Sequence, residues 1–337
     1  MKVTIVMPAY NVERYIERSV RSVLDQTMPD FELIIVDDGS TDMTVSVIKK
    51  MMASDPRIRL FQNEHGGSGA ARNSGAGKAT GKYLYFMDSD DLISRHALAH
   101  FLELADTNNA DIVVARFDMF TDATEASLDL SSEPPDIGAP VEIISGVELF
   151  RRSALTRCWK DRRIFNWLYF FRLDYWRDNN IAYHSFRFYE DLEIYPRFLF
   201  PAKRVLSADF RFYHYRLRTG AVNAAHQAHP DRIGCLLDVL SSVENTFREY
   251  GLMESMRSAC SRTLVIEHFH LLLFISKIES PVLRKPYLDR IDYQKLKNYM
   301  RDSGKKKHAI LSMLPFMTAS RLAVLLRMRL IAKGKAI

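Results

Sequence analysis

Residues 82–91 read KYLYFMDSDD, a run of apolar and aromatic side chains that ends abruptly in three carboxylates within four positions. Carboxylates repel one another, so a cluster of them at the end of an apolar strand favours a bound divalent cation with oxygen ligands. The pattern predicts a metal-assisted site for a phosphorylated ligand. A helix start, with one aspartate capping a helix that opens near Ser94, is the alternative interpretation.

Strand-like and helix-like segments alternate on both sides of this run. Apolar patterns predict strands at 3–7, 31–36, 57–61, 82–87 and 111–115, with helices between them at 12–26, 44–54, 70–79 and 96–107. This alternation predicts an α/β fold with a Rossmann-like, mostly parallel sheet covered by helices on both faces.

Three polar clusters follow three of these predicted strands. They are PAYN at residues 8–11, DDGSTD at 37–42 and DSDD at 88–91. Ligands of open parallel sheets bind beyond the carboxyl ends of the strands, where these clusters are expected to meet. We therefore expect one binding site built from all three.

The glycine-rich segment 66–78 fits neither common phosphate loop. A dinucleotide fingerprint and a Walker A loop both require glycine where this chain has Arg72. What remains is a flexible turn with an arginine near a helix start, which is suited to meet an anion. The alternative is that Arg72 is a surface residue of the helix.

Four motifs in this order resemble family 2 glycosyltransferases of the GT-A fold: PAYN at 8–11, VDDGSTD at 36–42, ARNSG at 71–75 and MDSDD at 87–91. The resemblance is strong over residues 1–120 and moderate over 145–223. It implies an inverting transfer of a sugar from a nucleotide diphosphate sugar, usually a UDP-sugar, with Mn²⁺ or Mg²⁺. The implied acceptor is a hydroxyl of a glycan or lipid-linked molecule in cell-surface polysaccharide synthesis.

The resemblance also implies roles for individual residues in donor binding. The nucleobase would be framed by Pro8, Tyr10 and Asp38, with Asp38 accepting a hydrogen bond from uracil, while Arg72 approaches the base or the diphosphate. The ribose and metal would be held by the acidic run, with Asp88 and Ser89 near the ribose and Asp90 on the metal.

The second half of the chain supplies the remaining implied residues. Asp191 in the segment FYEDLE is the expected catalytic base, with Glu190 as its neighbour or as an acceptor contact. His214 could complete the metal shell, or it could be a structural histidine of an aromatic strand. Taken without the upstream motifs, a Glu-Asp pair is usually a helix N-terminal turn.

Domain boundaries follow from the same resemblance. We expect a GT-A domain over residues 1–223, with a nucleotide-binding half at 1–115 and an acceptor half at 141–223. A helical C-terminal region with a basic tail is expected over 224–337.

Charge and targeting signals bear on location and partners. Residues 301–337 contain nine Lys or Arg but only one acid, and apolar residues are interleaved with them. This pattern favours peripheral contact of residues 305–337 with an anionic membrane. A protein interface or a solvated helix also fits. Nucleic acid is not an expected partner, because no stacking aromatics accompany the charges. The three cysteines lack a disulfide or zinc spacing, and no export signal or membrane span is expected, which favours the cytoplasm or the inner face of the plasma membrane.

Two other functions are weighed against the transferase. One is a nucleotide-sugar-binding scaffold that has lost catalysis. The other is a sugar-phosphate nucleotidyltransferase, which normally has a glycine-rich loop after its first strand, whereas residues 8–14 contain no glycine.

Overall fold

The computed structural model describes residues 1–131, 142–155, 164–218, 230–278 and 280–304. The chain forms two compact units, each assembled from three segments. The first comprises Met1–Gly146, Phe165–Glu190 and Pro201–Val222, and the second comprises Val147–Ile164, Asp191–Phe200 and Asn223–Ile337. The contiguous division expected at residue 223 stays a prediction.

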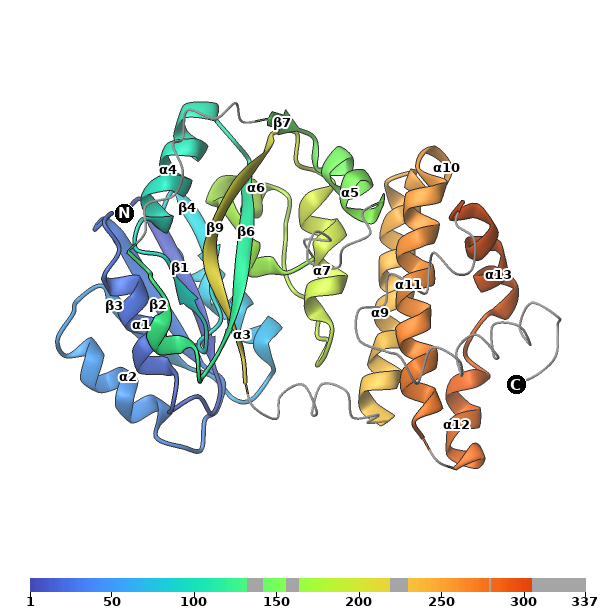
Figure 1. Cartoon of the computed structure of the whole chain (residues 1–337), viewed down its shortest axis with the longest axis horizontal. Coiled ribbons are helices and arrows are strands. Elements are labelled where there is room, and N and C mark those ends of the chain that lie inside the picture. The colour runs from blue at the N-terminus through green and yellow to red at the C-terminus, as the bar shows by residue number, and fades with distance from the viewer. Residues whose placement is uncertain (132–141, 156–163, 219–229, 279, 305–337) are drawn as a thin grey trace. The chain divides into compact units, whose positions relative to one another are not determined.

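A nine-stranded sheet forms the centre of the described part of the first unit, with the strand order β3-β2-β1-β4-β8-β6-β9-β5 and β7 paired to β9 (Figure 1). Its strands are β1 (Val3–Ala9), β2 (Phe31–Asp37), β3 (Ile58–Gln62), β4 (Tyr83–Phe86), β5 (Leu92–Ile93), β6 (Ile112–Thr121), β7 (Glu142–Ile144), β8 (Tyr169–Arg172) and β9 (Val205–Leu217). Strands β1 to β4 are parallel, while β8 joins β4 to β6 by antiparallel pairing. The predicted α/β class is confirmed.

Helices cover this sheet, as the sequence pattern requires. Every residue of β1 and β2 is buried, which means that both faces of these strands are packed. The helices of this unit are α1 (Ile16–Leu24), α2 (Thr44–Met52), α3 (Ser68–Gly77), α4 (Ala97–Asn108) and α6 (Leu173–Asp178), together with the short 3₁₀ turns η1 (Glu125–Ser127) and η3 (Asn166–Leu168).

The register of the sheet brings the predicted polar clusters to one edge. Ala9 pairs with Asp37, so β1 and β2 end at the same level, and Phe86 at the end of β4 pairs with Val6, three residues before Ala9. Backbone hydrogen bonds continue past the strands, from Asp38 N to Ala9 O at 2.8 Å and from Met87 N to Val6 O at 3.1 Å. The residues that follow these strands therefore lie together.

Helix α3 lies unusually close to β1, because Gly75 faces Val6. A Cβ atom at Gly75 would come within 2.3 Å of Val6 Cγ1, far inside van der Waals contact. At Gly77, two residues later in the same helix, an added Cβ would meet no atom within 4 Å. The close packing of α3 against β1 thus depends on one glycine.

The second unit is helical in its described residues. Its helices are the greater part of α5 (Gly146–Leu155) and of α7 (Glu190–Leu199), followed by α9 (Pro230–Glu249), α10 (Leu252–Ser255), α11 (Arg257–Ser276), α12 (Pro281–Leu288) and α13 (Tyr293–Asp302). Helices α9 and α11 run side by side (Figure 1). Phe150, Phe200 and Phe247 pack together, with ring centroids 5.2–5.9 Å apart.

The predicted basic tail, residues 305–337, lies outside the described residues. In the described part of the chain, no helix has both the length and the apolar character needed to cross a bilayer.

We expect Gly75→Ala to destabilise the fold by about 1–3 kcal/mol, because the new methyl group overpacks the α3–β1 contact. Gly77→Ala is the matched control and should be neutral or slightly stabilising, since alanine favours helix and the space is open. Urea unfolding of both variants measures the difference. Equal stabilities would contradict the close contact, and Val6→Ala should partly rescue Gly75→Ala.

Candidate active site

A cavity of about 450 Å³ opens at the sheet edge where the polar clusters meet. Its lining comprises Pro8, Ala9, Tyr10, Val12, Asp38, His65, Gly67, Ser68, Arg72, Asp88, Ser89, Asp90, Arg187, Phe188, Glu190 and Arg218. Eight of the ten predicted site residues are in this set, and Asp191 and His214 are not. The volume is in the range of small-molecule sites.

Asp38 forms one end of this cavity and is almost fully buried, with 3% of its surface exposed. Its carboxylate accepts hydrogen bonds from the backbone N–H groups of Gly66 and Gly67, both at 2.9 Å. The Nδ1 atom of His65 lies 2.8 Å from Asp38 Oδ2, and the His65 ring stacks on Tyr10 with centroids 4.4 Å apart. Two of the predicted base-binding residues, Tyr10 and Asp38, thus meet at one end of the cavity.

Arg72 crosses the floor of the cavity and is 3% exposed. Its guanidinium donates to Asp88 Oδ1 at 2.7 Å and to Glu190 Oε1 at 3.0 Å. Ser68 also donates to Glu190 Oε1. The alternative interpretation of Arg72 as a surface residue is therefore wrong, because α3 turns this side chain inward, where it joins two predicted site carboxylates.

The acidic run 88–91 forms the other end of the cavity. Asp91 is fully buried and accepts hydrogen bonds from Tyr213 Oη at 2.6 Å and from the Arg216 backbone N–H at 2.7 Å. Asp90 is partly exposed, and its Oδ2 accepts from Arg218 Nε at 2.6 Å. Burial raises the pKa of Asp90 and Asp91, and the charges of neighbouring aspartates raise both further.

This environment fits a divalent cation. Asp88 and Asp90 offer carboxylate oxygens to one cavity, and such oxygens are the donors that Mg²⁺ and Mn²⁺ prefer. A raised aspartate pKa means that the negative charges are short of compensation, which a cation would supply. No three His, Cys, Asp or Glu side chains among the described residues form a ready metal cage, so ligand oxygens or water would complete the shell.

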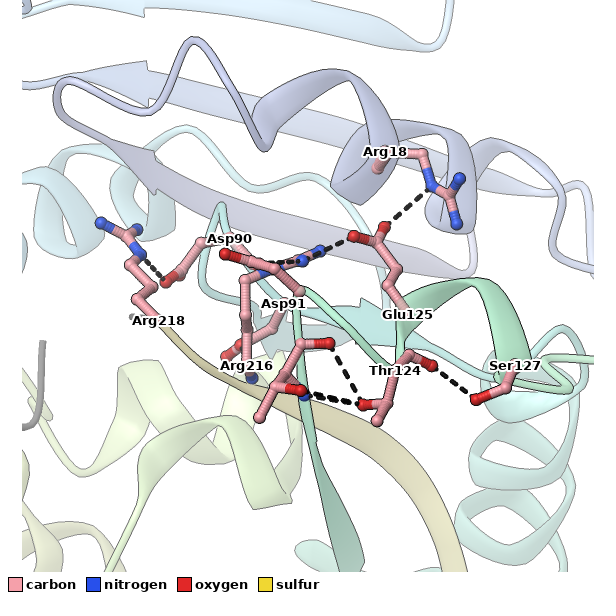
Figure 2. Close-up of polar contacts among 10 residues, drawn as sticks. Arg18, Asp90, Asp91, Thr124, Glu125, Ser127, Arg216 and Arg218 are labelled. Atoms are coloured by element: carbon pink, nitrogen blue, oxygen red, sulfur yellow. Dashed lines mark hydrogen bonds and ion pairs between the residues drawn. The ribbon is translucent and has the colours of Figure 1, made fainter. Parts of the chain in front are cut away.

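Arg216 fixes the acidic run from beneath and is 3% exposed (Figure 2). Its Nε donates to the Asp90 backbone oxygen at 2.7 Å, and its Nη1 pairs with Asp122 at 2.9 Å and Glu125 at 2.6 Å. Glu125 also pairs with Arg18 of α1 at 3.1 Å. One guanidinium therefore connects the Asp90 backbone with η1 and the segment before it.

His214 does not line the cavity. It is 8% exposed, its Nε2 lies 3.0 Å from Ser94 Oγ, and burial lowers its pKa. Its predicted role as a metal ligand stays a prediction.

Glu190 and Asp191 begin α7, directly after Tyr189, whose φ of +63° is in the left-handed region. Glu190 lines the cavity, while Asp191 is the first residue of the second unit in this stretch. The predicted role of Asp191 as a base stays a prediction.

Eight of the sixteen residues that line the cavity were absent from the predicted site, and four of them stand out. Arg218 pairs with Asp90, His65 pairs with Asp38, and Arg187 with Phe188 lines the wall. Only His65 had a local signal, as a titratable residue directly before the glycine-rich turn. The others are brought in by long-range folding.

We expect Arg216→Met to cost about 3–5 kcal/mol of stability, because it removes a buried cation and leaves carboxylates facing one another. Arg211→Met on the same strand is the matched control, since Arg211 is 59% exposed and its pair with Asp118 is solvent-screened. Denaturant unfolding gives both values. A loss at position 216 no larger than at 211 would contradict the proposed anchoring of the acidic run.

The family model described as "Glycosyl transferase family 2" matches residues 4–184, more than half of the chain. Uncharacterized glycosyltransferase EpsJ of Bacillus subtilis (strain 168) is 32% identical over 216 residues, which are 64% of this chain and 60% of that protein. Uncharacterized glycosyltransferase YibD of Escherichia coli (strain K12) is 27% identical over 227 residues, or 67% of this chain and 64% of YibD. The chain thus spans less than two thirds of these relatives.

Solved structures share the fold at low sequence identity. The crystal structure of S. aureus TarS 1-349 in complex with UDP-GlcNAc has a TM-score of 0.66 and 19% identity, covering 98% of this chain and 89% of that one. The mannosyltransferase PcManGT from Pyrobaculum calidifontis, in complex with GDP-Man and Mn²⁺, has a TM-score of 0.52 and 16% identity, covering 95% and 87%. These likenesses establish the fold alone.

Proposed function

The chain belongs to glycosyl transferase family 2, and on that premise we propose that it transfers a sugar from a UDP-sugar to a hydroxyl of a glycan or lipid-linked acceptor, with inversion. The observation that supports the proposal most is the cavity itself. Its lining includes a stacking and hydrogen-bonding pair, Tyr10 and Asp38, the acidic residues Asp88 and Asp90, and Arg72. A nucleotide diphosphate has parts that match these groups: a planar base, a ribose and two phosphates.

The base end suits uracil. Asp38 is an acceptor held by two backbone N–H groups, and uracil carries a ring N–H between two carbonyl groups. Tyr10 is 44% exposed and offers an aromatic surface next to that acceptor. TarS carries UDP-GlcNAc in its complex, whereas PcManGT carries GDP-Man, so both donor classes occur on this fold. We propose UDP for this chain.

The diphosphate end needs positive charge. Breaking the bond between sugar and phosphate builds negative charge on the departing diphosphate, and a bound Mn²⁺ or Mg²⁺ would offset that charge. Asp90 would hold the cation, with Asp88 near the ribose. Arg218 pairs with Asp90 and would turn toward the phosphates when a cation takes its place on the carboxylate.

Inversion requires one in-line attack by the acceptor hydroxyl on the anomeric carbon. That hydroxyl must lose its proton to a positioned base, and we propose Asp191 for this role, with Glu190 contacting the acceptor. Glu190 is tied to Arg72 and Ser68, which fixes the start of α7 at the cavity wall.

Location and pathway are part of the same proposal. We propose that the chain acts at the inner face of the plasma membrane in building a cell-surface polysaccharide, held by its basic tail, residues 305–337, through anionic lipids.

Nucleotide binding tests the donor class. We expect calorimetry to detect UDP binding in the presence of Mn²⁺, weaker binding of GDP and CDP, and none of NAD. Asp90→Asn should remove the metal-dependent part of UDP affinity, because it removes a negatively charged ligand of the cation. UDP affinity that is indifferent to both Mn²⁺ and Asp90 would rule out the metal site.

Transfer assays test the catalytic base. We expect Asp191→Asn to lower the transfer rate about 10²–10⁴-fold, the usual contribution of a positioned base, while UDP affinity stays unchanged. Asp209→Asn is the matched control, because Asp209 is an aspartate of β9 that is 81% exposed. Full activity of Asp191→Asn would assign the base elsewhere, and no turnover of any acceptor by the unaltered protein would favour a scaffold.

A further inference from the structure

His65 contacts both residues that we propose recognise the nucleobase, Tyr10 and Asp38. Its ring stacks on Tyr10 with centroids 4.4 Å apart and an interplanar angle of 25°. Its Nδ1 lies 2.8 Å from Asp38 Oδ2 and 3.1 Å from the Asp38 backbone oxygen. The side chain is 47% exposed, so it is held by these contacts rather than by burial.

The hydrogen-bonding capacity of Asp38 Oδ2 is used up as a result. Oδ1 accepts from Gly66 N–H, while Oδ2 accepts from Gly67 N–H and faces His65 Nδ1. A carboxylate oxygen accepts about two hydrogen bonds, so Oδ2 has no room for another N–H donor. A ring inserted between Tyr10 and His65 would also need about twice the present separation, because each stacked layer takes roughly 3.5–4 Å.

We propose that His65 is a placeholder in the donor site, whose imidazole holds the place of the nucleobase on Tyr10 and Asp38, turns out as the base enters and thereby sets the nucleotide affinity. The inference rests on the proposed function and deepens it. The exchange is balanced: a ring N–H replaces the imidazole N–H on Oδ2, and one planar ring replaces another on Tyr10. The Gly66 and Gly67 N–H groups hold Asp38 throughout, so only a half-exposed side chain has to rotate.

The cost of this exchange is the same for every base. Uracil brings a ring N–H that replaces the imidazole N–H on Asp38, whereas cytosine has a bare lone pair at the same ring position, so the contact with Asp38 itself favours UDP. Displacing His65 is a cost of the free protein that any base has to meet, so His65 lowers the affinities for UDP and CDP by the same factor.

The test is calorimetric titration of UDP and CDP, with Mn²⁺, into the full chain, His65→Ala and His100→Ala. His100 lies on α4, is partly exposed and does not line the cavity, so it is the matched control. We expect His65→Ala to bind UDP about twofold to fivefold tighter, the equivalent of one exposed ion pair, and to gain the same factor for CDP. The UDP:CDP affinity ratio should stay the same, while His100→Ala leaves both affinities unchanged.

Equal or weaker UDP binding by His65→Ala, with binding by the unaltered chain intact, would overturn the role of His65 and leave the proposed function standing. Failure of every nucleotide to bind both proteins would overturn the proposed function and this inference with it.

Proton NMR gives an independent readout. The His65 ring proton, assigned by its absence in His65→Ala, should be shifted upfield by the Tyr10 ring in the free protein. UDP should return it toward the position of a solvent-exposed histidine. A resonance that keeps its upfield shift at saturating UDP would show that the imidazole stays on Tyr10 and would overturn the exchange.

Discussion

The arrangement of the cavity depends on one buried cation, the guanidinium of Arg216. Three carboxylates within four residues would repel one another and straighten out of a turn if their backbone were free. Arg216 holds the Asp90 carbonyl through its side chain and the Asp91 carboxylate through its backbone N–H. Because Asp122 and Glu125 neutralise it from the other side, it does this without carrying an unbalanced charge into the interior.

Three arginines at the site have different tasks, which burial and partners separate. Arg216 is enclosed by aromatic rings and acids, and its side chain holds the acidic run through the Asp90 backbone oxygen. Arg72 is equally buried but bridges two carboxylates of the cavity. Arg218 is 32% exposed and has the freedom to exchange partners. The charges of Arg216 and Arg72 are thus held in buried ion pairs that shape the site. The charge of Arg218 can change partners where we expect a charged ligand.

The parallel half of the sheet and its polar edge could be predicted because both are local patterns. Apolar runs at 3–7, 31–36 and 82–87 each precede a polar cluster, and parallel strands must end at one edge. The antiparallel strand β8 was not predicted, because the four residues Tyr169–Arg172 carry no periodicity that separates a strand from a core helix. Residues such as Arg218 are brought to Asp90 across more than a hundred positions, which no local signal reports.

Gly75 places a constraint on any redesign of this pocket. Arg72 lies one helical turn before it on α3, so the depth at which the helix rests on Val6 also sets the height of that guanidinium above the sheet. A library of variants that changes only the residues lining the cavity would therefore leave the height of Arg72 above the sheet unchanged. The residues at positions 6 and 75 lie behind the pocket and together set the distance between α3 and β1. That distance determines how far the Arg72 guanidinium would lie from an anion bound in the cavity.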